Sequence, residues 1–295
     1  MAVTFGLTID VDAPFPELLD RATTGEALGF DTLYVPDHSR PWRREPQAGD
    51  LWHDGWTVLA AFASATSTAR VGTLVSNPVL RPPDLLVREA LAVDHLSSGR
   101  LQLGIGTGIA GFDHEATGTP YWPMRERLAR FREYAAFVDG ALRSGGAPFD
   151  HGGDVYRSRL VGLPAPTQLP RPPITVAGAS KGVRAVAVER AESWNTHGAF
   201  GVAPEDLVDH LRALNADVTA RCEAEERVPA TLQRSVLLFD SLSPWSRPGR
   251  LAELVEEMSE IGFEELVVFW PWDDEQRRVF EKDAAATVGG AVDGR

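Results

Sequence analysis

Cysteine is almost absent from this chain of 295 residues, which contains only Cys222. A single cysteine excludes a disulfide framework and any metal site built on several cysteines, and it fits a reducing compartment such as the cytoplasm. Long hydrophobic runs are also missing, since no stretch approaches the roughly 20 apolar residues of a membrane span. The first residues carry no basic segment and soon reach Asp10 and Asp12. We therefore expect a cytoplasmic protein with no signal peptide and no membrane partner.

Lysine is scarce as well. Lys181 and Lys282 are the only lysines among 29 basic residues, and all the others are arginine. With the abundant Ala, Gly and Pro, this bias indicates a GC-rich bacterial source, and we expect an actinobacterium. Acidic residues number 42, so the formal net charge is −13. A surface of this charge disfavours binding to nucleic acid or to anionic membranes.

Short β-rich runs alternate with longer segments of helical periodicity. Eight runs are predicted to be strands: Val3–Ile9, Thr32–Val35, Val71–Val75, Leu101–Ile105, Ile174–Ala177, Ser193–Thr196, Ser235–Phe239 and Leu266–Trp270. Several are apolar at consecutive positions, which is typical of parallel strands buried on both faces. Eight helices are predicted between and after them: Pro16–Leu28, Trp56–Ser67, Pro83–Ser97, Arg125–Leu142, Lys181–Arg190, Pro204–Cys222, Gly249–Ile261 and Gln276–Val288.

Eight strand–helix units predict an α/β fold, a (β/α)8 TIM barrel that takes residues 1–295 as a single domain. An open doubly wound sheet is the second candidate. Two connections exceed ordinary loops: residues 39–55 after the second strand and the insertion 107–173 after the fourth. Chemistry in such a barrel belongs at the C-terminal ends of the strands. Those ends carry mostly polar residues, glycine and tryptophan: Asp10, Asp12, Asp37, His38, Ser76, Asn77, Gly106–Gly108, Gly178–Ser180, Asn195–His197, Asp240, Trp270 and Trp272.

The pair Asp37-His38 directly follows the second predicted strand. Histidine gains or loses a proton near neutral pH, and a neighbouring carboxylate can hold it in its charged form. The alternative is a turn with an Asp cap and an exposed histidine. Because the pair stands at a strand's C-terminal end, we favour the functional interpretation.

Two glycine-containing loops follow other strands. Gly106-x-Gly108-x-x-Gly111 matches the dinucleotide fingerprint formally, but that motif opens directly into a helix, whereas Phe112–Trp122 is polar and rich in turn residues. These glycines either let the backbone approach a ligand or form a tight turn. The run ITVAGASKG leads from a strand into a helix start, where backbone N–H groups bind phosphate well. Ordinary capping by Ser180 is the alternative.

Signatures of other chemistries are absent. The seven histidines are scattered, with no HExxH and no HxH after the first strand, so we expect no metal site. No GxSxG is present, which leaves nucleophilic catalysis without support. Trp42, Trp52, Trp270 and Trp272 stand near strand ends, where they would either wall an apolar pocket or serve in packing.

Several of these segments together resemble the bacterial luciferase-like monooxygenase superfamily, whose members are flavin- or deazaflavin-dependent barrels. The segments are ALGFDTLYVPDH and the longer run SATSTARVGTLVSNPVLRPPDLLVREALAVDHLSSGRLQLGIGTG. The similarity is clear from about Val3 to Gly198. It implies a reduced isoalloxazine-type ring at the C-terminal mouth of the barrel.

The resemblance also implies positions for the cofactor contacts. Asp37 and His38 fall at the ring, and a non-proline cis peptide that backs the ring falls at Leu74-Val75. Asn77 matches a polar ring contact, and Thr107 and Gly108 match backbone contacts. Gly178, Ala179 and Ser180 match the phosphate-side loop. His38 is then the catalytic acid or base, and Asp37 orients it.

One departure from the family pattern concerns the substrate. In the sugar-phosphate dehydrogenase branch, a catalytic glutamate follows the Gly-Thr-Gly of strand four, and here that residue is Ile109. The departure argues against a sugar-phosphate substrate and leaves His38 as the main acid/base candidate. The aspartate-glycine that often closes strand six appears as Trp194-Asn195, so ligand contacts there are doubtful.

We therefore predict an oxidoreductase that transfers hydride between coenzyme F420 and a small or medium organic substrate. The closest alternative is a two-component monooxygenase that uses oxygen and reduced FMN. A separate reductase would supply the reduced FMN. An alternative of another class is a flavin-binding barrel without turnover. The resemblance also implies a homodimer.

Overall fold

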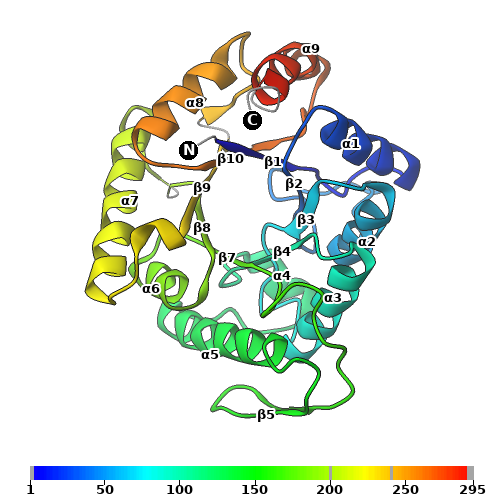
Figure 1. The fold of residues 1–295 in the computed structure, drawn as a ribbon. Helices are drawn as coiled ribbons and strands as arrows, with labels where there is room; N and C mark the ends of the chain where they lie inside the picture. The colour runs from blue at the N-terminus through cyan, green and yellow to red at the C-terminus, as the bar shows by residue number, and fades with distance from the viewer. Residues whose placement is uncertain (1–2, 199–200, 240–241, 291–295) are drawn as a thin grey trace.

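The computed structural model describes residues 3–198, 201–239 and 242–290. Eight parallel strands close into a barrel in the order β1, β10, β9, β8, β7, β4, β3, β2 (Figure 1). These strands are β1 Thr4–Thr8, β2 Thr32–Val35, β3 Arg70–Thr73, β4 Leu101–Ile105, β7 Ile174–Ala177, β8 Ser193–Thr196, β9 Gln233–Leu237 and β10 Glu265–Phe269. The predicted (β/α)8 barrel is confirmed, and the open sheet is excluded by the pairing of β1 with β10.

An outer ring of helices surrounds the strands (Figure 1). The helices are α1 Phe15–Ala27, α2 Gly55–Ala65, α3 Pro83–Leu96, α5 Met124–Leu142, α6 Lys181–Arg190, α7 Leu207–Ala224, α8 Arg250–Glu260 and α9 Asp274–Ala284. Each coincides with a predicted helix to within a few residues. Among the described residues, no helix combines the length and the apolar character that crossing a bilayer demands.

The strands are buried because their residues face the barrel interior on one side and the helices on the other. Every residue of β4 and β10 is buried, as is every residue of β2 and β8. Leu7, Leu33, Val236 and Leu266 have no exposed surface at all. The consecutive apolar residues in the sequence thus report burial on both faces.

The insertion between β4 and β7 holds two features that the sequence did not predict. A short helix, α4 Gly111–Thr117, takes up the first half of the segment Phe112–Trp122 that we expected to form turns. An antiparallel hairpin of β5 Phe149–Gly152 and β6 Arg157–Leu160 lies outside the barrel. The carboxylate of Glu133 on α5 accepts the N–H groups of Val155 and Tyr156 at the hairpin turn. Because these partners are distant in sequence, local periodicity does not reveal them.

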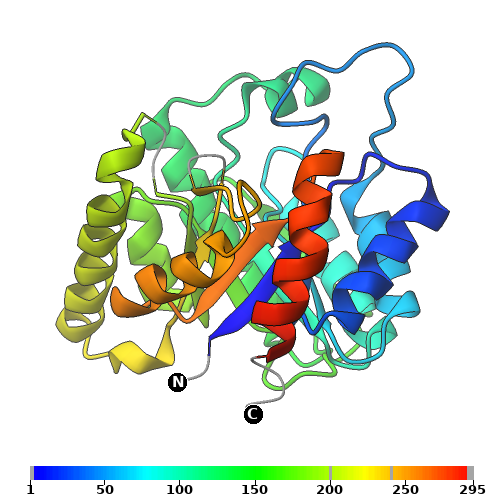
Figure 2. The same ribbon diagram turned by 90° about the horizontal axis from the view of Figure 1, so that it is seen from above.

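The two long connections rise from the same end of the barrel. Figure 2 shows the segment after β2 (blue) and α4 (teal) above the C-terminal ends of the strands, on the side opposite the two termini. The segment after β2 and the first part of the insertion are therefore placed to line the barrel mouth. Asp240, at a predicted strand end, lies outside the described residues.

Candidate functional site at the barrel mouth

A cis peptide bond lies just after the end of β3. The bond between Leu74 and Val75 is cis although no proline is involved, so the cis peptide predicted at this position is confirmed. The strand was expected to run to Val75, but it ends before the cis bond. Beyond it, the Ser76 N–H donates to the carbonyl of Gly104 at 3.0 Å, and the Gly106 N–H donates to the carbonyl of Ser76 at 2.8 Å.

Glycines after β4 are required by close packing. A Cβ atom on Gly106 would lie 2.6 Å from Cγ2 of Val75, and one on Gly108 would lie 2.7 Å from Cγ2 of Val79. Gly108 also has a φ of +73°, which disfavours other residues. Thr107 between them is half-buried. This loop thus lies against the cis-peptide segment, next to the position where the resemblance puts the ring.

The side chain of Asn77 holds its own turn. Its Oδ1 accepts the Val79 and Leu80 N–H groups at 3.0 and 3.3 Å, and its Nδ2 donates to the carbonyl of Asp37 at 3.4 Å. The side chain is buried and its amide is used by the backbone. Contact between Asn77 and a cofactor remains a prediction.

Asp37 does not orient His38. Its carboxylate accepts hydrogen bonds from Arg81, with Nη2 at 3.0 Å from Oδ1, and from the Ser76 hydroxyl at 2.7 Å. The Ser76 oxygen in turn accepts Nε1–H of Trp56 at 2.9 Å. Asp37 is 1% exposed. The prediction that Asp37 positions the imidazole is thus wrong, because the half-buried Arg81 and the Ser76 hydroxyl occupy the carboxylate.

The carboxylate that contacts His38 belongs to Asp113 on α4. Asp113 Oδ2 lies 2.8 Å from His38 Nδ1, and Asp113 Oδ1 accepts the N–H and the hydroxyl of Ser39, each at 2.8 Å. Burial alone would raise the pKa of the Asp113 carboxyl, but the hydrogen bonds from His38 and Ser39 outweigh it and the pKa lies below its usual value. Asp113 is therefore ionised at neutral pH.

Aromatic rings surround the imidazole of His38. Its ring centroid lies 5.2 Å from that of Trp42 and 5.6 Å from that of Phe112, and the latter two rings are 5.5 Å apart. Trp52 donates Nε1–H to the carbonyl of His38 at 2.7 Å. The His38 side chain is 21% exposed. The ring is thus held by its neighbours while part of the side chain stays exposed.

A second aromatic wall stands where β9 and β10 end, on the other side of β1 from β2. The guanidinium carbon of Arg43 lies 2.9 Å from the ring centroid of Trp272 and 4.8 Å from those of Phe239 and Phe269. Arg43 comes from the segment after β2, so this segment crosses the mouth above the end of β1. Trp42 and Trp272 therefore make ring contacts near the strand ends, whereas Trp270 is buried against Phe280.

Asp10 follows β1, between these two walls in the strand order. Burial raises the pKa of its carboxyl to about 6, the charge of Asp12 adds to the shift, and the charges of Arg43, Arg21 and His38 oppose it. The mouth thus contains a carboxyl whose pKa of about 6 lies near neutral pH.

The loop after β7 contains Gly178, Ala179 and Ser180, and binding of a phosphate by this loop stays a prediction. Gly178 has a φ of +141°, and the Ser180 hydroxyl accepts the Val183 N–H at 3.4 Å, which caps α6. Lys181 is exposed at the first position of the helix. Arg184, in the first turn of α6, is paired with Asp217 at 2.7 Å. An anion at this loop could accept hydrogen bonds from the backbone N–H groups at the start of α6 and pair with the ammonium group of Lys181.

The sequence profile of luciferase-like monooxygenases matches residues 3–240 of this chain. The chain belongs to the luciferase-like monooxygenase family. An F420-dependent glucose-6-phosphate dehydrogenase of Intrasporangium calvum is 35% identical over 146 residues, which are 48% of this chain and 42% of that protein. The match spans about two fifths of that relative. An uncharacterised protein of Mycobacterium bovis is 32% identical over 245 residues, covering 77% of this chain and 82% of that protein.

Solved structures show the same luciferase-like barrel. An F420-dependent secondary alcohol dehydrogenase in complex with an F420-acetone adduct superposes with a TM-score of 0.76 and 16% identity, covering 97% of this chain and 99% of that chain. A riboflavin lyase with modified FMN and riboflavin has a TM-score of 0.77 and 16% identity, covering 98% and 92%. At these identities the likeness concerns the fold.

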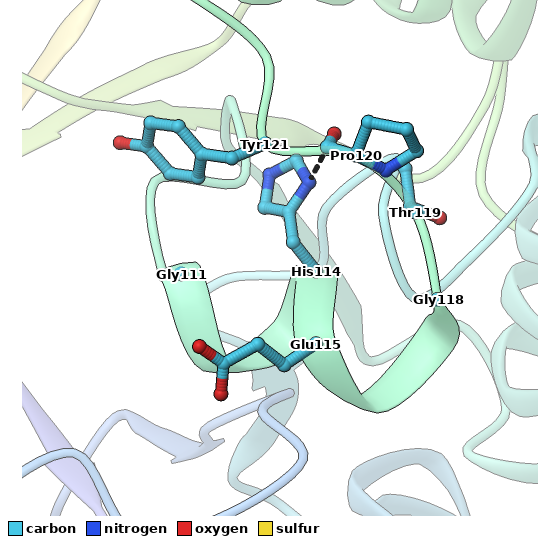
Figure 3. A pocket seen from close by; sticks show the side chains of 7 residues that line it. All are labelled: Gly111, His114, Glu115, Gly118, Thr119, Pro120 and Tyr121. Carbon is cyan, nitrogen blue, oxygen red and sulfur yellow. Dashed lines mark hydrogen bonds between the residues drawn. The ribbon is translucent and has the colours of Figure 1, made fainter.

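A cavity of about 430 Å³ lies beside α4 of this luciferase-like barrel, lined by Gly111, His114, Glu115, Gly118, Thr119, Pro120 and Tyr121 (Figure 3). Figure 3 shows the imidazole of His114 between Tyr121 and Pro120. Its Nδ1 bonds to the carbonyl of Pro120 at 3.0 Å and its Nε2 to that of Gly108 at 3.3 Å. His114 therefore holds the insertion together, while Asp113 beside it on α4 bonds to His38.

Sequence reasoning missed three residues of this luciferase-like site: Asp113, Arg81 and Arg43. The run FDH did contain an acidic residue just beyond the strand-four glycines, which is the one available signal for Asp113. Arg81 and Arg43 carried none. Within residues 3–198, 201–239 and 242–290, no three His, Cys, Asp or Glu side chains gather closely enough to hold a metal ion.

Proposed function

We propose that this protein is an F420-dependent oxidoreductase that transfers hydride between the deazaflavin and a small or medium organic substrate. Membership of the luciferase-like family and the similarity to F420-dependent dehydrogenases support this function. The observation that carries the proposal is the partly exposed imidazole of His38 after β2, whose Nδ1 is bonded to the carboxylate of Asp113.

The residues at the mouth fit a flat cofactor with an anionic tail. Gly106 and Gly108 leave no room for a Cβ, so the backbone there packs directly on the side chains of Val75 and Val79. The ten-residue helix α6 presents its N-terminus and Lys181 at the loop Gly178–Ser180, where a phosphate would be held. When bound, coenzyme F420 would supply the hydride chemistry.

Within this arrangement His38 would move the proton. Oxidation of an alcohol releases a hydride from carbon and a proton from the hydroxyl oxygen, and His38 Nε2 would accept that proton. In the reverse direction the imidazolium would return it to the carbonyl oxygen. Asp37, Arg81 and Ser76 hold the loop that carries His38, and the rings of Trp42 and Phe112 exclude water from its faces.

The substrate we propose is not a sugar phosphate. Ile109 occupies the position where that branch carries its acid, and its side chain is 42% exposed. The wall of Phe239, Phe269 and Trp272 adds apolar surface on the substrate side. A small alcohol, aldehyde or ketone with an apolar body suits this mouth better than a phosphorylated sugar.

A parallel fluorescence titration with F420 and FMN tests the cofactor. We expect micromolar or tighter binding to F420 alone, followed by turnover with members of a panel of alcohols, aldehydes and ketones. Glucose 6-phosphate is expected to give none. Tight binding to FMN alone, with oxygen consumption from supplied FMNH2, would identify the two-component monooxygenase and its separate reductase. Cofactor binding without turnover across the panel would favour the non-catalytic barrel.

His38→Ala tests the site directly. We expect roughly a 10²-fold loss of turnover with little change in F420 affinity, because the imidazole acts on the proton. His95→Ala, on the last turn of α3, is the matched control and leaves both unchanged. Equal turnover of His38→Ala and the parent enzyme is incompatible with this role.

We further propose a cytoplasmic homodimer of actinobacterial origin, which sedimentation and cell fractionation would test.

A further inference from the structure

We propose that Asp113 is the positioning residue of the reaction: it fixes the tautomer of His38 so that Nε2 is the nitrogen that exchanges the proton. This inference rests on the function proposed above. It replaces the role that we first gave to Asp37, whose carboxylate Arg81 and Ser76 hold.

Both carboxylate oxygens of Asp113 have assigned donors. Oδ1 accepts two bonds from Ser39, one from the backbone N–H and one from the hydroxyl. Oδ2 faces Nδ1 of His38 at 2.8 Å. Asp113 has no exposed surface, so water does not compete for these contacts. The carboxylate can therefore neither rotate nor exchange partners without losing several hydrogen bonds.

An ionised carboxylate accepts hydrogen bonds and donates none. The ring nitrogen opposite it must therefore carry a proton, which places the proton of neutral His38 on Nδ1. Nε2, on the other edge of the ring, is then an acceptor and can take a proton from a substrate hydroxyl. When it has done so, the carboxylate stabilises the imidazolium.

The origin of Asp113 is also informative. It comes from the insertion after β4, four residues beyond Ile109, in the segment that supplies the acid in the sugar-phosphate branch. In this chain the acidic side chain of that segment acts on the histidine and not on the substrate. The substrate side of the mouth is thereby left to apolar residues such as Ile109.

Asp113→Asn separates tautomer control from simple packing. The two Ser39 donors require an oxygen, so the carboxamide oxygen takes the place of Oδ1 and the NH₂ group faces His38 Nδ1. That nitrogen must then accept a hydrogen bond, which moves the proton of neutral His38 to Nε2. Ser39→Ala is the matched control, since it removes one bond to Asp113 Oδ1 and leaves the contact with His38 intact.

The readout is ¹⁵N NMR of the full chain labelled at its histidines, with the His38 signals identified by His38→Gln. At alkaline pH we expect the proton on Nδ1 in the parent protein and in Ser39→Ala, and on Nε2 in Asp113→Asn. This measurement needs no cofactor, so it stands even if the proposed function fails. A proton on Nε2 in the parent protein, or an unchanged tautomer in Asp113→Asn, would overturn the inference, and the first result requires no variant to fold.

The second readout is turnover with F420 and a substrate from the panel described above. We expect Asp113→Asn to lower kcat roughly 10²-fold with little change in KM, and Ser39→Ala to stay within about threefold. A tautomer change with unaltered kcat would overturn the role of Asp113 in the reaction. Absence of turnover in the parent protein would count against the proposed function alone.

Discussion

The guanidinium of Arg81 donates two hydrogen bonds to the carboxylate of Asp37, with Nη2 at 3.0 Å from Oδ1 and Nε at 3.2 Å from Oδ2. The same guanidinium also contacts Asp54 and Glu89. One arginine thus gathers three carboxylates from the segment after β2 and from α3. This cluster ties the loop that carries His38 to the body of the barrel.

The first prediction concerns how much the Asp37–Arg81 pair contributes to the free energy of unfolding. Asp37→Ala leaves Arg81 without its most buried partner and removes the bond from Ser76, so we expect a loss of about 3 kcal/mol of unfolding free energy. Asp54→Ala is the control: its side chain is 46% exposed and caps α2, so its removal costs about 1 kcal/mol. Urea unfolding measures both. Equal losses would contradict a buried pair.

The second prediction concerns pH. Burial raises the pKa of the Glu89 carboxyl to about 7, with Asp37 and Asp54 adding to the shift and Arg81 opposing it. The usual value of 4.5 holds for the unfolded chain. Between these two pH values the folded protein binds more protons, so this contribution to stability is full below pH 4.5 and falls as pH rises toward 7.

Glu89→Gln should therefore flatten the dependence of the unfolding free energy on pH. The comparison is urea unfolding at about pH 5 and about pH 7.5, taken as a difference between variant and parent so that other titrating groups cancel. Glu256→Gln, at an exposed position of α8, is the control and keeps the parent's slope. If the unfolding free energy of Glu89→Gln changes with pH as steeply as that of the parent, the Glu89 carboxyl does not titrate between these pH values.

The third prediction concerns the segment that crosses the mouth. Arg43 stacks on Trp272 and pins residues 44–51, which are exposed. Arg43→Leu removes a cation–π contact of about 1 kcal/mol, so cleavage by endoproteinase Asp-N between Gly49 and Asp50 should be roughly fivefold faster. Arg44→Leu, which breaks only an exposed pair with Asp50, should change the rate little. Similar rates for both variants would mean that Arg43 does not fasten the segment.

The fourth prediction concerns packing between β3 and β4. A Cβ on Gly104 would lie 1.9 Å from the backbone oxygen of Thr73, whereas one on Gly111 would meet nothing within 4 Å. Gly104→Ala should therefore cost about 3 kcal/mol or more, because the backbone itself must shift. Gly111→Ala is expected to leave the midpoint of thermal unfolding unchanged or slightly higher. Tolerance of alanine at residue 104 would refute the close approach of the two strands.

The sequence by itself determined the barrel and much of its mouth. Consecutive apolar residues in runs such as Leu101–Ile105 reflect burial on both faces, and that property is local in the chain. The position of His38 after β2 also followed from a short segment of sequence, and the resemblance to the luciferase-like family implied the cis bond at Leu74-Val75. Even the departure at Ile109 was visible without coordinates.

Only the tertiary structure decided which side chains act on one another. Asp113 is 75 residues from His38, and Arg81 is 44 residues from Asp37. Asp37 is adjacent to His38 in the chain, so the sequence favoured the wrong partner. Closure of the barrel brings α4 and the segment after β2 to the same mouth. Which groups a carboxylate contacts there depends on distance in space, and the order of residues along the chain does not reveal that distance.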